Sequence, residues 1–143
     1  MKFLDTGIIL CSVLKDQPHH ENCAKIMRAI ETGEETAMTS VLTIAELQYV
    51  LCGREKLAAD TAKRVFYSLF DCAGLEITGA ESQIAKKAVD MSLKYGIDFA
   101  DAANIHIMEE HGITEIYSLD SDFDRFKGIK RLSSLPSASK HFK

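Results

Sequence analysis

Short runs of apolar residues alternate along the chain with longer stretches in which apolar residues recur every three or four positions. The first pattern is typical of buried strands and the second of amphipathic helices. Thr6 and Ser40 are expected to cap the helices that follow them, and Gly96 is expected to end one. The predicted strands are 2–5, 36–39, 75–78, 115–118 and an edge strand at 129–132, and the predicted helices are 7–14, 18–30, 41–51, 57–73, 82–95 and 98–111.

The alternation of strands and helices predicts an α/β fold in which helices cover both faces of a mostly parallel sheet. A chain of 143 residues is the size of one domain with its own core. We expect this domain to span residues 1–132. Residues 133–143, which contain several serines and a proline, are expected to form an irregular C-terminal tail.

Composition excludes two classes of protein and indicates a compartment. With 46% hydrophobic and 27% charged residues, the chain is too apolar to be disordered, and no apolar stretch approaches the ~20 residues of a membrane span. The four cysteines form no CxxC pair, so they are expected to be reduced thiols, and no signal-peptide cleavage site follows the apolar start. We therefore expect a cytoplasmic protein that does not contact membranes.

Acidic residues follow two of the predicted strands. Asp5 ends the first strand and Asp120 comes just after the last clear one, and ligands of parallel sheets gather at the carboxyl ends of strands. Taken alone, Asp120 is better explained as a turn residue. Glu46 lies between Leu42 and Val50 on an apolar helical stripe, where a carboxylate must be paired, protonated or bound to a metal, unless it reaches solvent at the edge of the stripe.

Two further acids, Asp98 and Asp101, lie at the start of one helix, a position that the helix dipole alone explains. Asp98 is best explained as a cap. If Asp5, Glu46, Asp101 and Asp120 meet at one edge of the sheet, they require cations, because two like charges ~4 Å apart repel by ~4 kcal/mol at an effective dielectric constant of 20. A site built only of oxygen ligands favours Mg²⁺ or Mn²⁺ over zinc.

The sequence lacks the motifs of several other enzyme classes. It contains no GxGxxG, P-loop, GxSxG or HExxH pattern. A phosphotransfer domain with Asp5 as phosphoryl acceptor is also disfavoured, because enzymes resembling haloacid dehalogenases have a second aspartate two residues later, and Gly7 stands there.

Four segments in order along the chain resemble a known family. They are Phe3-Leu4-Asp5-Thr6, Ser40-Val41-Leu42-Thr43-Ile44-Ala45-Glu46-Leu47, Phe99-Ala100-Asp101-Ala102-Ala103 and Ser118-Leu119-Asp120-Ser121-Asp122-Phe123. Together they look like a PIN domain, most similar to VapC-type toxins. Two positions depart from the family pattern: Gly7 stands where many members have Ser or Asn, and Ser118 where Thr is usual.

The resemblance implies a three-layer α/β/α sandwich and a Mg²⁺- or Mn²⁺-dependent endoribonuclease that cleaves RNA through a metal-activated water. It implies Asp5, Glu46, Asp101 and Asp120 as catalytic residues and metal ligands, with Asp122 as a fifth ligand. It also implies a homodimer and a small antitoxin protein that lays a helix into a groove, for which we expect the third and fourth helices, 41–73. The alternatives are a non-catalytic PIN-like module that binds RNA or protein, and an RNA-processing nuclease outside a toxin-antitoxin pair.

The net charge of −4 agrees with this site. The chain has 17 Lys and Arg against 21 Asp and Glu, so the two signs balance once the four proposed catalytic acids are set aside. Six of the basic residues lie in positions 125–143, which contain no acid. This stretch could guide an RNA backbone toward the site, although a solvated basic tail explains it equally well.

Overall fold

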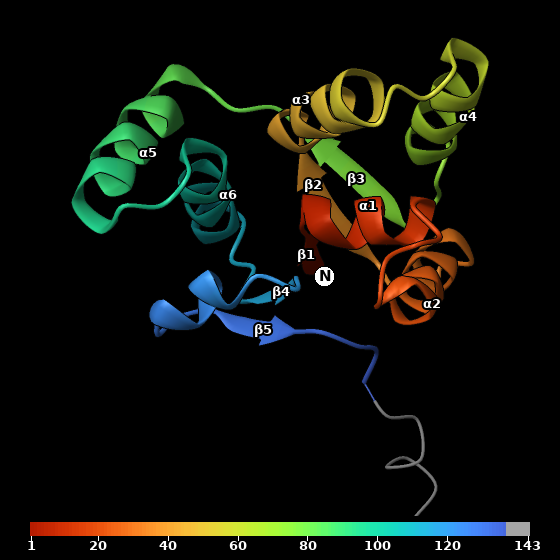
Figure 1. Cartoon of the computed structure of the whole chain (residues 1–143). Coiled ribbons are helices and arrows are strands. Elements are labelled where there is room, and N and C mark those ends of the chain that lie inside the picture. Colours follow the sequence, from red (N-terminus) through yellow and green to blue (C-terminus); the bar gives the residue numbers. More distant parts are fainter. Residues whose placement is uncertain (137–143) are drawn as a thin grey trace, which may run out of the picture.

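The computed structural model describes residues 1–136, and five parallel strands form its central sheet, in the order β3-β2-β1-β4-β5 (Figure 1). The strands are β1 (Lys2–Leu4), β2 (Ala37–Ser40), β3 (Leu75–Thr78), β4 (Glu115–Tyr117) and β5 (Lys130–Leu132). β5 pairs with β4 at one edge, as expected for the segment 129–132. The helices are α1 (Thr6–Val13), α2 (His20–Glu31), α3 (Val41–Gln48), α4 (Ala59–Phe70), α5 (Ser82–Tyr95) and α6 (Phe99–Glu110).

Alternating side chains of the central strands build two separate cores. Phe3 of β1 and Ile116 of β4 pack on the side of α5 and α6, whereas the next residues, Leu4 and Tyr117, pack on the side of α1 and α2. Figure 1 shows these two helix pairs on opposite sides of the sheet. The predicted three-layer α/β/α sandwich with a parallel sheet is confirmed, and the period of two along each strand is its cause.

Helix boundaries agree with the predictions where a local signal sets them. The Ser40 hydroxyl accepts a hydrogen bond from the Leu42 N–H at 3.2 Å and caps α3, and Gly96 ends α5 with φ of 67°, which a glycine adopts without strain. At α1 the expected cap was wrong. Asp5 is the capping residue, and its carboxylate accepts from the Thr6 N–H at 2.9 Å.

Other boundaries differ because tertiary packing outweighs local preference. The helix predicted over 57–73 is shorter, and the one expected to stop before Gly53 continues past α3 as a π-helical segment, η1 (Tyr49–Arg54). The acidic turn after β4 leads into a short 3₁₀ helix, η2 (Ser121–Arg125). Residues 133–136 form no helix or strand and 137–143 lie outside the described residues, so a domain over 1–132 with an irregular tail at 133–143 stays a prediction. None of the helices within 1–136 has the length and apolar character needed to cross a bilayer.

Gly74 lies close to the backbone at the end of α2. A Cβ at this position would lie 2.2 Å from the Ile30 carbonyl oxygen and 2.8 Å from the Glu35 carbonyl oxygen. We therefore expect Gly74→Ala to lower the free energy of unfolding by about 3 kcal/mol, or roughly 10 °C in melting temperature. Gly79→Ala is the matched control, since nothing lies within 4 Å of its Cβ. Equal melting temperatures for the two variants would contradict the close approach.

Candidate functional site

Carboxylates from four elements line one cavity beyond the carboxyl ends of β1 and β4. Asp5 follows β1, Asp120 follows β4, Glu46 lies on α3, and Asp101 lies in the first turn of α6. The cavity has a volume of about 380 Å³. It is lined by Asp5, Thr6, Gly7, Leu10, Glu46, Val50, Asp98, Asp101, Leu119 and Asp120. The fold thus brings together the four acids that the sequence predicted to meet.

Asp5 is the most buried of these acids, with 7% of its surface exposed. Its carboxylate accepts hydrogen bonds from the Thr6 N–H at 2.9 Å and from the Ser118 hydroxyl at 2.7 Å. The Ser118 oxygen in turn accepts from the Asp120 N–H at 3.0 Å, so one hydroxyl fixes two acids. Burial raises the pKa of Asp5 to about 6, against the lowering effect of these hydrogen bonds, and the charges of Glu46 and Asp120 add to the rise.

Glu46 is half-buried and has a hydroxyl partner rather than a cation. The Thr6 hydroxyl donates to its carboxylate at 2.8 Å. Burial raises the pKa of Glu46, with a further contribution from the charge of Asp98, and the hydrogen bond from Thr6 opposes the rise. Glu46 therefore has a neutral hydrogen-bond partner, and its half-buried side chain lines the cavity, so a metal-binding role for Glu46 stays a prediction.

Among the acids of the cluster, Asp101 has the pKa that is raised most. Burial and the charges of Asp5, Glu46, Asp120 and Asp98, in that order, raise the pKa of Asp101 to about 8. Among the described residues that line the cavity there is no Lys or Arg to offset them. The site therefore favours bound protons or bound cations, as the sequence argument from charge repulsion predicted.

The donor set fits a hard divalent cation that keeps part of its water shell. Within residues 1–136, no three His, Cys, Asp or Glu side chains are close enough to enclose one ion. Mg²⁺ does not require such a cage, because it usually retains several waters and binds through one or two carboxylates together with substrate phosphates. All the charged donors lining the cavity are carboxylate oxygens, which suit Mg²⁺ and Mn²⁺.

Two other acids lie differently from their predicted roles. Asp98 occupies the N-cap position of α6, but its side chain makes no capping hydrogen bond and lines the cavity instead, so the simple capping interpretation was wrong. Asp122 is exposed in η2 and is not among the residues that line the cavity; its N–H donates to the Asp120 carboxylate at 2.9 Å. A metal-binding role for Asp122 stays a prediction.

Two hydroxyl residues hold the acids, in roles that the sequence did not indicate, and a third polar residue, which the sequence reasoning missed, links two of the helices around the site. Thr6 and Ser118 hold Asp5 and Glu46 as described, and the Ser118 hydroxyl serves where the family pattern has Thr. Asn104, one turn after Asp101 and fully buried, accepts from the Ser40 hydroxyl at 2.7 Å and links α6 to α3. The sequence signal for Asn104 was a polar residue inside the apolar run from Ala102 to Ile105. With Gly7 in place of the Ser or Asn of many family members, the Asp5 carboxylate still accepts hydrogen bonds from Thr6 and Ser118.

Comparisons with known proteins bear on the family and the fold. The family model described as "PIN domain" matches residues 2–129. Ribonuclease VapC13 of Mycobacterium tuberculosis is 28% identical over 136 residues, which cover 93% of this chain and all of that protein. VapC20 of the same organism, a toxin that cleaves the Sarcin-Ricin loop, has a TM-score of 0.73 at 17% identity over 87% of this chain and 94% of its own.

A structure of VapBC2 from Rickettsia felis, bound to a DNA fragment from its promoter, has a TM-score of 0.64 at 16% identity. The alignment covers 92% of this chain and 96% of the Rickettsia felis chain. At 16–17% identity, the two solved structures establish a common fold.

Proposed function

The chain belongs to the PIN domain family, and we propose that it is a Mg²⁺- or Mn²⁺-dependent endoribonuclease that acts as the toxin of a toxin-antitoxin pair. One observation carries the proposal: acids from four elements line one cavity that contains no Lys or Arg among its described lining residues, and burial together with neighbouring carboxylates raises the pKa of Asp5 and of Asp101. Such a cluster needs divalent cations before a polyanion can approach. The ribonuclease names of the relatives support RNA as the substrate.

We assign the metal site to the cavity lined by Asp5, Glu46, Asp101 and Asp120, whose carboxylates would hold the ion directly or through the waters that it keeps. When bound, the metal supplies an activated water for in-line attack and stabilises negative charge on the leaving oxygen. The chain itself supplies orientation. The Ser118 hydroxyl holds Asp5 and the backbone of Asp120 in place, and the Thr6 hydroxyl holds Glu46. Because the attacking group would be a water, the reaction requires no nucleophilic side chain.

An antitoxin helix has a groove available beside α4. A cavity of about 270 Å³ lies between α4 and the pair α1 and α2, and its apolar wall includes Ile9, Met27, Val65 and Leu69. We therefore place the helix against α4, as predicted, with α1 and α2 rather than α3 as the facing wall. An amphipathic helix that lays its apolar face into a groove is a common mode of peptide recognition. Solved toxin-antitoxin complexes with this fold support such a partner.

The genomic neighbourhood separates a toxin from an RNA-processing nuclease outside such a pair. A small adjacent reading frame that encodes a DNA-binding protein supports the toxin, and its absence favours the processing nuclease. The homodimer and the cytoplasmic location stay predictions, and sedimentation of the purified protein tests the first.

The test of the nuclease is cleavage of total RNA by the purified protein. We expect discrete fragments with Mg²⁺ or Mn²⁺ and a loss of rate of roughly 1,000-fold in EDTA, because a metal contributes several kcal/mol to the transition state and each 1.36 kcal/mol is tenfold in rate. Protein prepared in parallel with Asp5→Asn controls for contaminating nucleases. Cleavage that is equally fast in EDTA, or equally fast with Asp5→Asn, would exclude the proposed site.

A further inference from the structure

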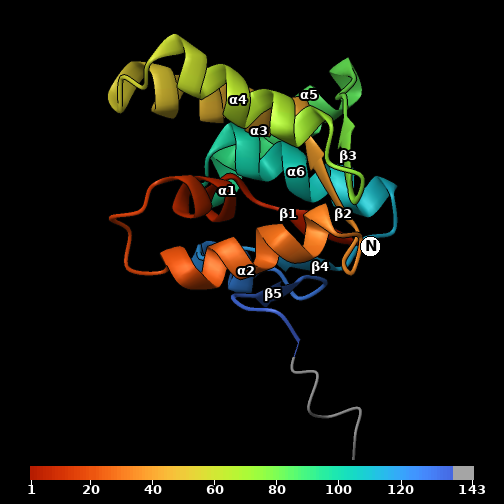
Figure 2. The same ribbon diagram turned by 90° about the vertical axis from the view of Figure 1, so that its right-hand side faces the viewer.

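A second cavity, of about 300 Å³, adjoins the carboxylate cavity. The two share four lining residues, Gly7, Leu10, Val50 and Leu119, so one is the continuation of the other. Its walls come from α1, from the connection between α1 and α2, and from η1 and the residue after it. Figure 2 shows the α1–α2 connection and the turn between η1 and α4 projecting on the same side of the molecule.

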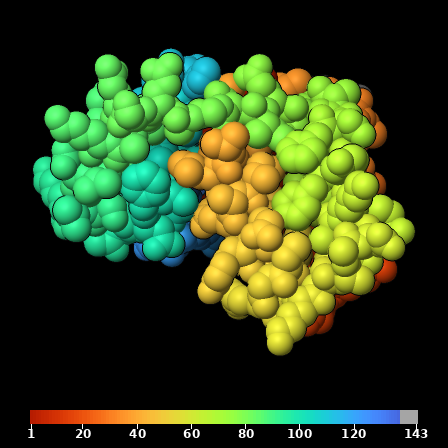
Figure 3. All heavy atoms as spheres, turned by 90° about the horizontal axis from the view of Figure 1, so that it is seen from above, coloured from red at the N-terminus to blue at the C-terminus, as the bar shows by residue number. Residues whose placement is uncertain are grey.

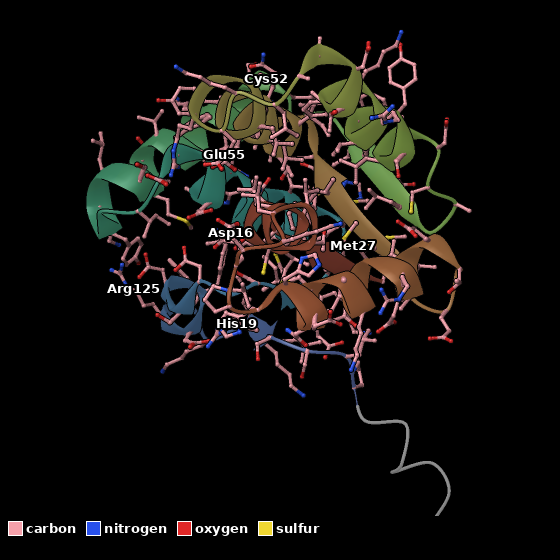
Figure 4. All side chains as sticks on the ribbon, turned by 45° about the vertical axis from the view of Figure 1, so that its right-hand side comes forward. Asp16, His19, Met27, Cys52, Glu55 and Arg125 are labelled. Atoms are coloured by element: carbon pink, nitrogen blue, oxygen red, sulfur yellow. The ribbon has the colours of Figure 1, made fainter. Side chains whose placement is uncertain are left out.

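The second cavity combines an apolar wall with polar groups of a different kind from the first. Leu10, Leu14, Pro18, Val50 and Leu119 form the apolar part. The polar part consists of Gln17, His19, Arg54 and Glu55. Figure 4 shows the labelled Glu55 and His19 on either side of Asp16, coming from separate elements. The pairing of an apolar wall with a few polar groups is typical of a small-ligand subsite.

Arg54 is the residue that distinguishes the two cavities. Arg54 is exposed and ends η1. Among the described residues that line the two cavities, Arg54 is the only Lys or Arg, and it lines the second cavity. Acids crowd the first cavity and a guanidinium lies beside the second. A guanidinium binds phosphate oxygens with two parallel hydrogen bonds and keeps its charge at all accessible pH values.

The π-helical segment explains why Arg54 lies there. η1 continues directly from α3, which carries Glu46, and the Glu55 N–H donates to the Val50 carbonyl at 2.8 Å, the i to i+5 spacing of a π-helix. π-helical segments occur frequently at functional sites. Figure 3 shows α3 and η1 in the middle of the face seen from above, between α4 on one side and α5 with α6 on the other.

We propose that the second cavity binds the nucleotide next to the phosphodiester that is cut, with Arg54 on its phosphate and its base against the wall of Leu14 and Pro18. This inference rests on the proposed nuclease function and names the form of its substrate. A base can enter such a cavity only when it is unstacked, which indicates single-stranded or looped RNA. Gln17, His19 and Glu55 supply hydrogen-bonding groups for the base edge.

The first test measures binding without cleavage. A labelled single-stranded oligoribonucleotide is titrated with Asp101→Asn protein in Mg²⁺, with and without Arg54→Ala, at several salt concentrations. We expect Arg54→Ala to weaken binding about 10-fold and to reduce the slope of log K against log salt by about 0.7, the value for one phosphate contact on a single strand. Arg64→Ala is the matched control, an exposed arginine on α4 that lines neither cavity. It should change neither quantity.

The second test uses the cleaving protein and a short RNA that carries one mapped cut. Arg54→Ala is expected to raise KM about 10-fold with little change in kcat, because it removes binding common to substrate and transition state. Replacing each nucleotide in turn by an abasic one should identify one position beside the cut that slows wild-type cleavage. That sensitivity should disappear in the double variant Gln17→Ala, His19→Ala.

The outcomes separate this inference from the proposed function. If wild-type protein cleaves RNA and Arg54→Ala changes neither KM nor the salt slope, the subsite is wrong and the nuclease stands. If no RNA is cleaved but binding depends on Arg54, the nuclease fails, and the second cavity is an RNA-binding site without a neighbouring cut, which overturns the subsite as proposed. Uniform sensitivity to abasic nucleotides on both sides of the cut would also overturn the subsite.

Discussion

Asp101→Asn is expected to abolish RNA cleavage and, at the same time, to raise the melting temperature of the metal-free protein. Burial first, and then the charges of four other acids, raise the pKa of the half-buried Asp101 to about 8. Asparagine keeps the shape of the side chain and removes its charge. We expect cleavage to fall at least ~1,000-fold. Stability should rise by about 1 kcal/mol after solvent screening, or 2–4 °C, because a mutual repulsion is lost.

Asp5→Asn and Asp90→Asn complete the test of Asp101. Asp5→Asn should lose cleavage equally but gain no stability, because the buried Asp5 carboxylate accepts hydrogen bonds from Thr6 and Ser118. Asp90→Asn is the matched control, an exposed aspartate on α5 away from the cavity. Cleavage and thermal melting in EDTA are measured for all three. An Asp101→Asn protein that cuts RNA at the wild-type rate would place the active site elsewhere.

The second large effect is a loss of stability of the metal-free protein as the pH rises from about 4 to about 8. In the folded protein the pKa of Asp5 is raised to about 6 and that of Asp101 to about 8, whereas both are 3.8 in a model peptide. Over this range the folded state holds more protons than the unfolded state, so the free energy of unfolding falls with rising pH. The stabilisation by the two protonated carboxyl groups is complete below about pH 4. It is lost as the pH rises through about 6 for Asp5 and through about 8 for Asp101.

Mn²⁺ should reverse this loss at pH 8, because it binds the ionised cluster of the folded state. At a concentration 100 times its Kd, a ligand of the folded state adds about 2.7 kcal/mol. Urea unfolding in EDTA and in Mn²⁺ at pH 5, 6, 7 and 8 measures both effects. Subtracting the same series for Asp101→Asn removes the contribution of the histidines. A difference that does not vary with pH, or a midpoint that Mn²⁺ does not move, would contradict a carboxylate cluster.

Much of the fold was accessible from local patterns. β3 and α5 begin and end where the sequence predicted, because Gly96 and the limits of the apolar runs are local signals. The end of α3 was not accessible in this way. Its extension into η1 runs past Gly53, and the packing of Leu51, fully buried within that segment, is decided by distant parts of the chain.

By itself, the sequence determined the α/β order of elements and indicated the four acids as candidates for one site. Apolar periodicity and charge repulsion are properties of neighbouring residues and of residue type, so no structure was needed to state them.

Tertiary structure alone decided which groups surround those acids. In the folded protein Asp5 is buried and accepts a hydrogen bond from the Ser118 hydroxyl. Asp98 lines the carboxylate cavity instead of capping its helix, and Arg54 lines the neighbouring cavity. Burial and the distance between side chains far apart in sequence arise only when the sheet and its two helix layers have assembled. These two quantities set the raised pKa values of Asp5 and Asp101, on which the proposal of a divalent cation rests.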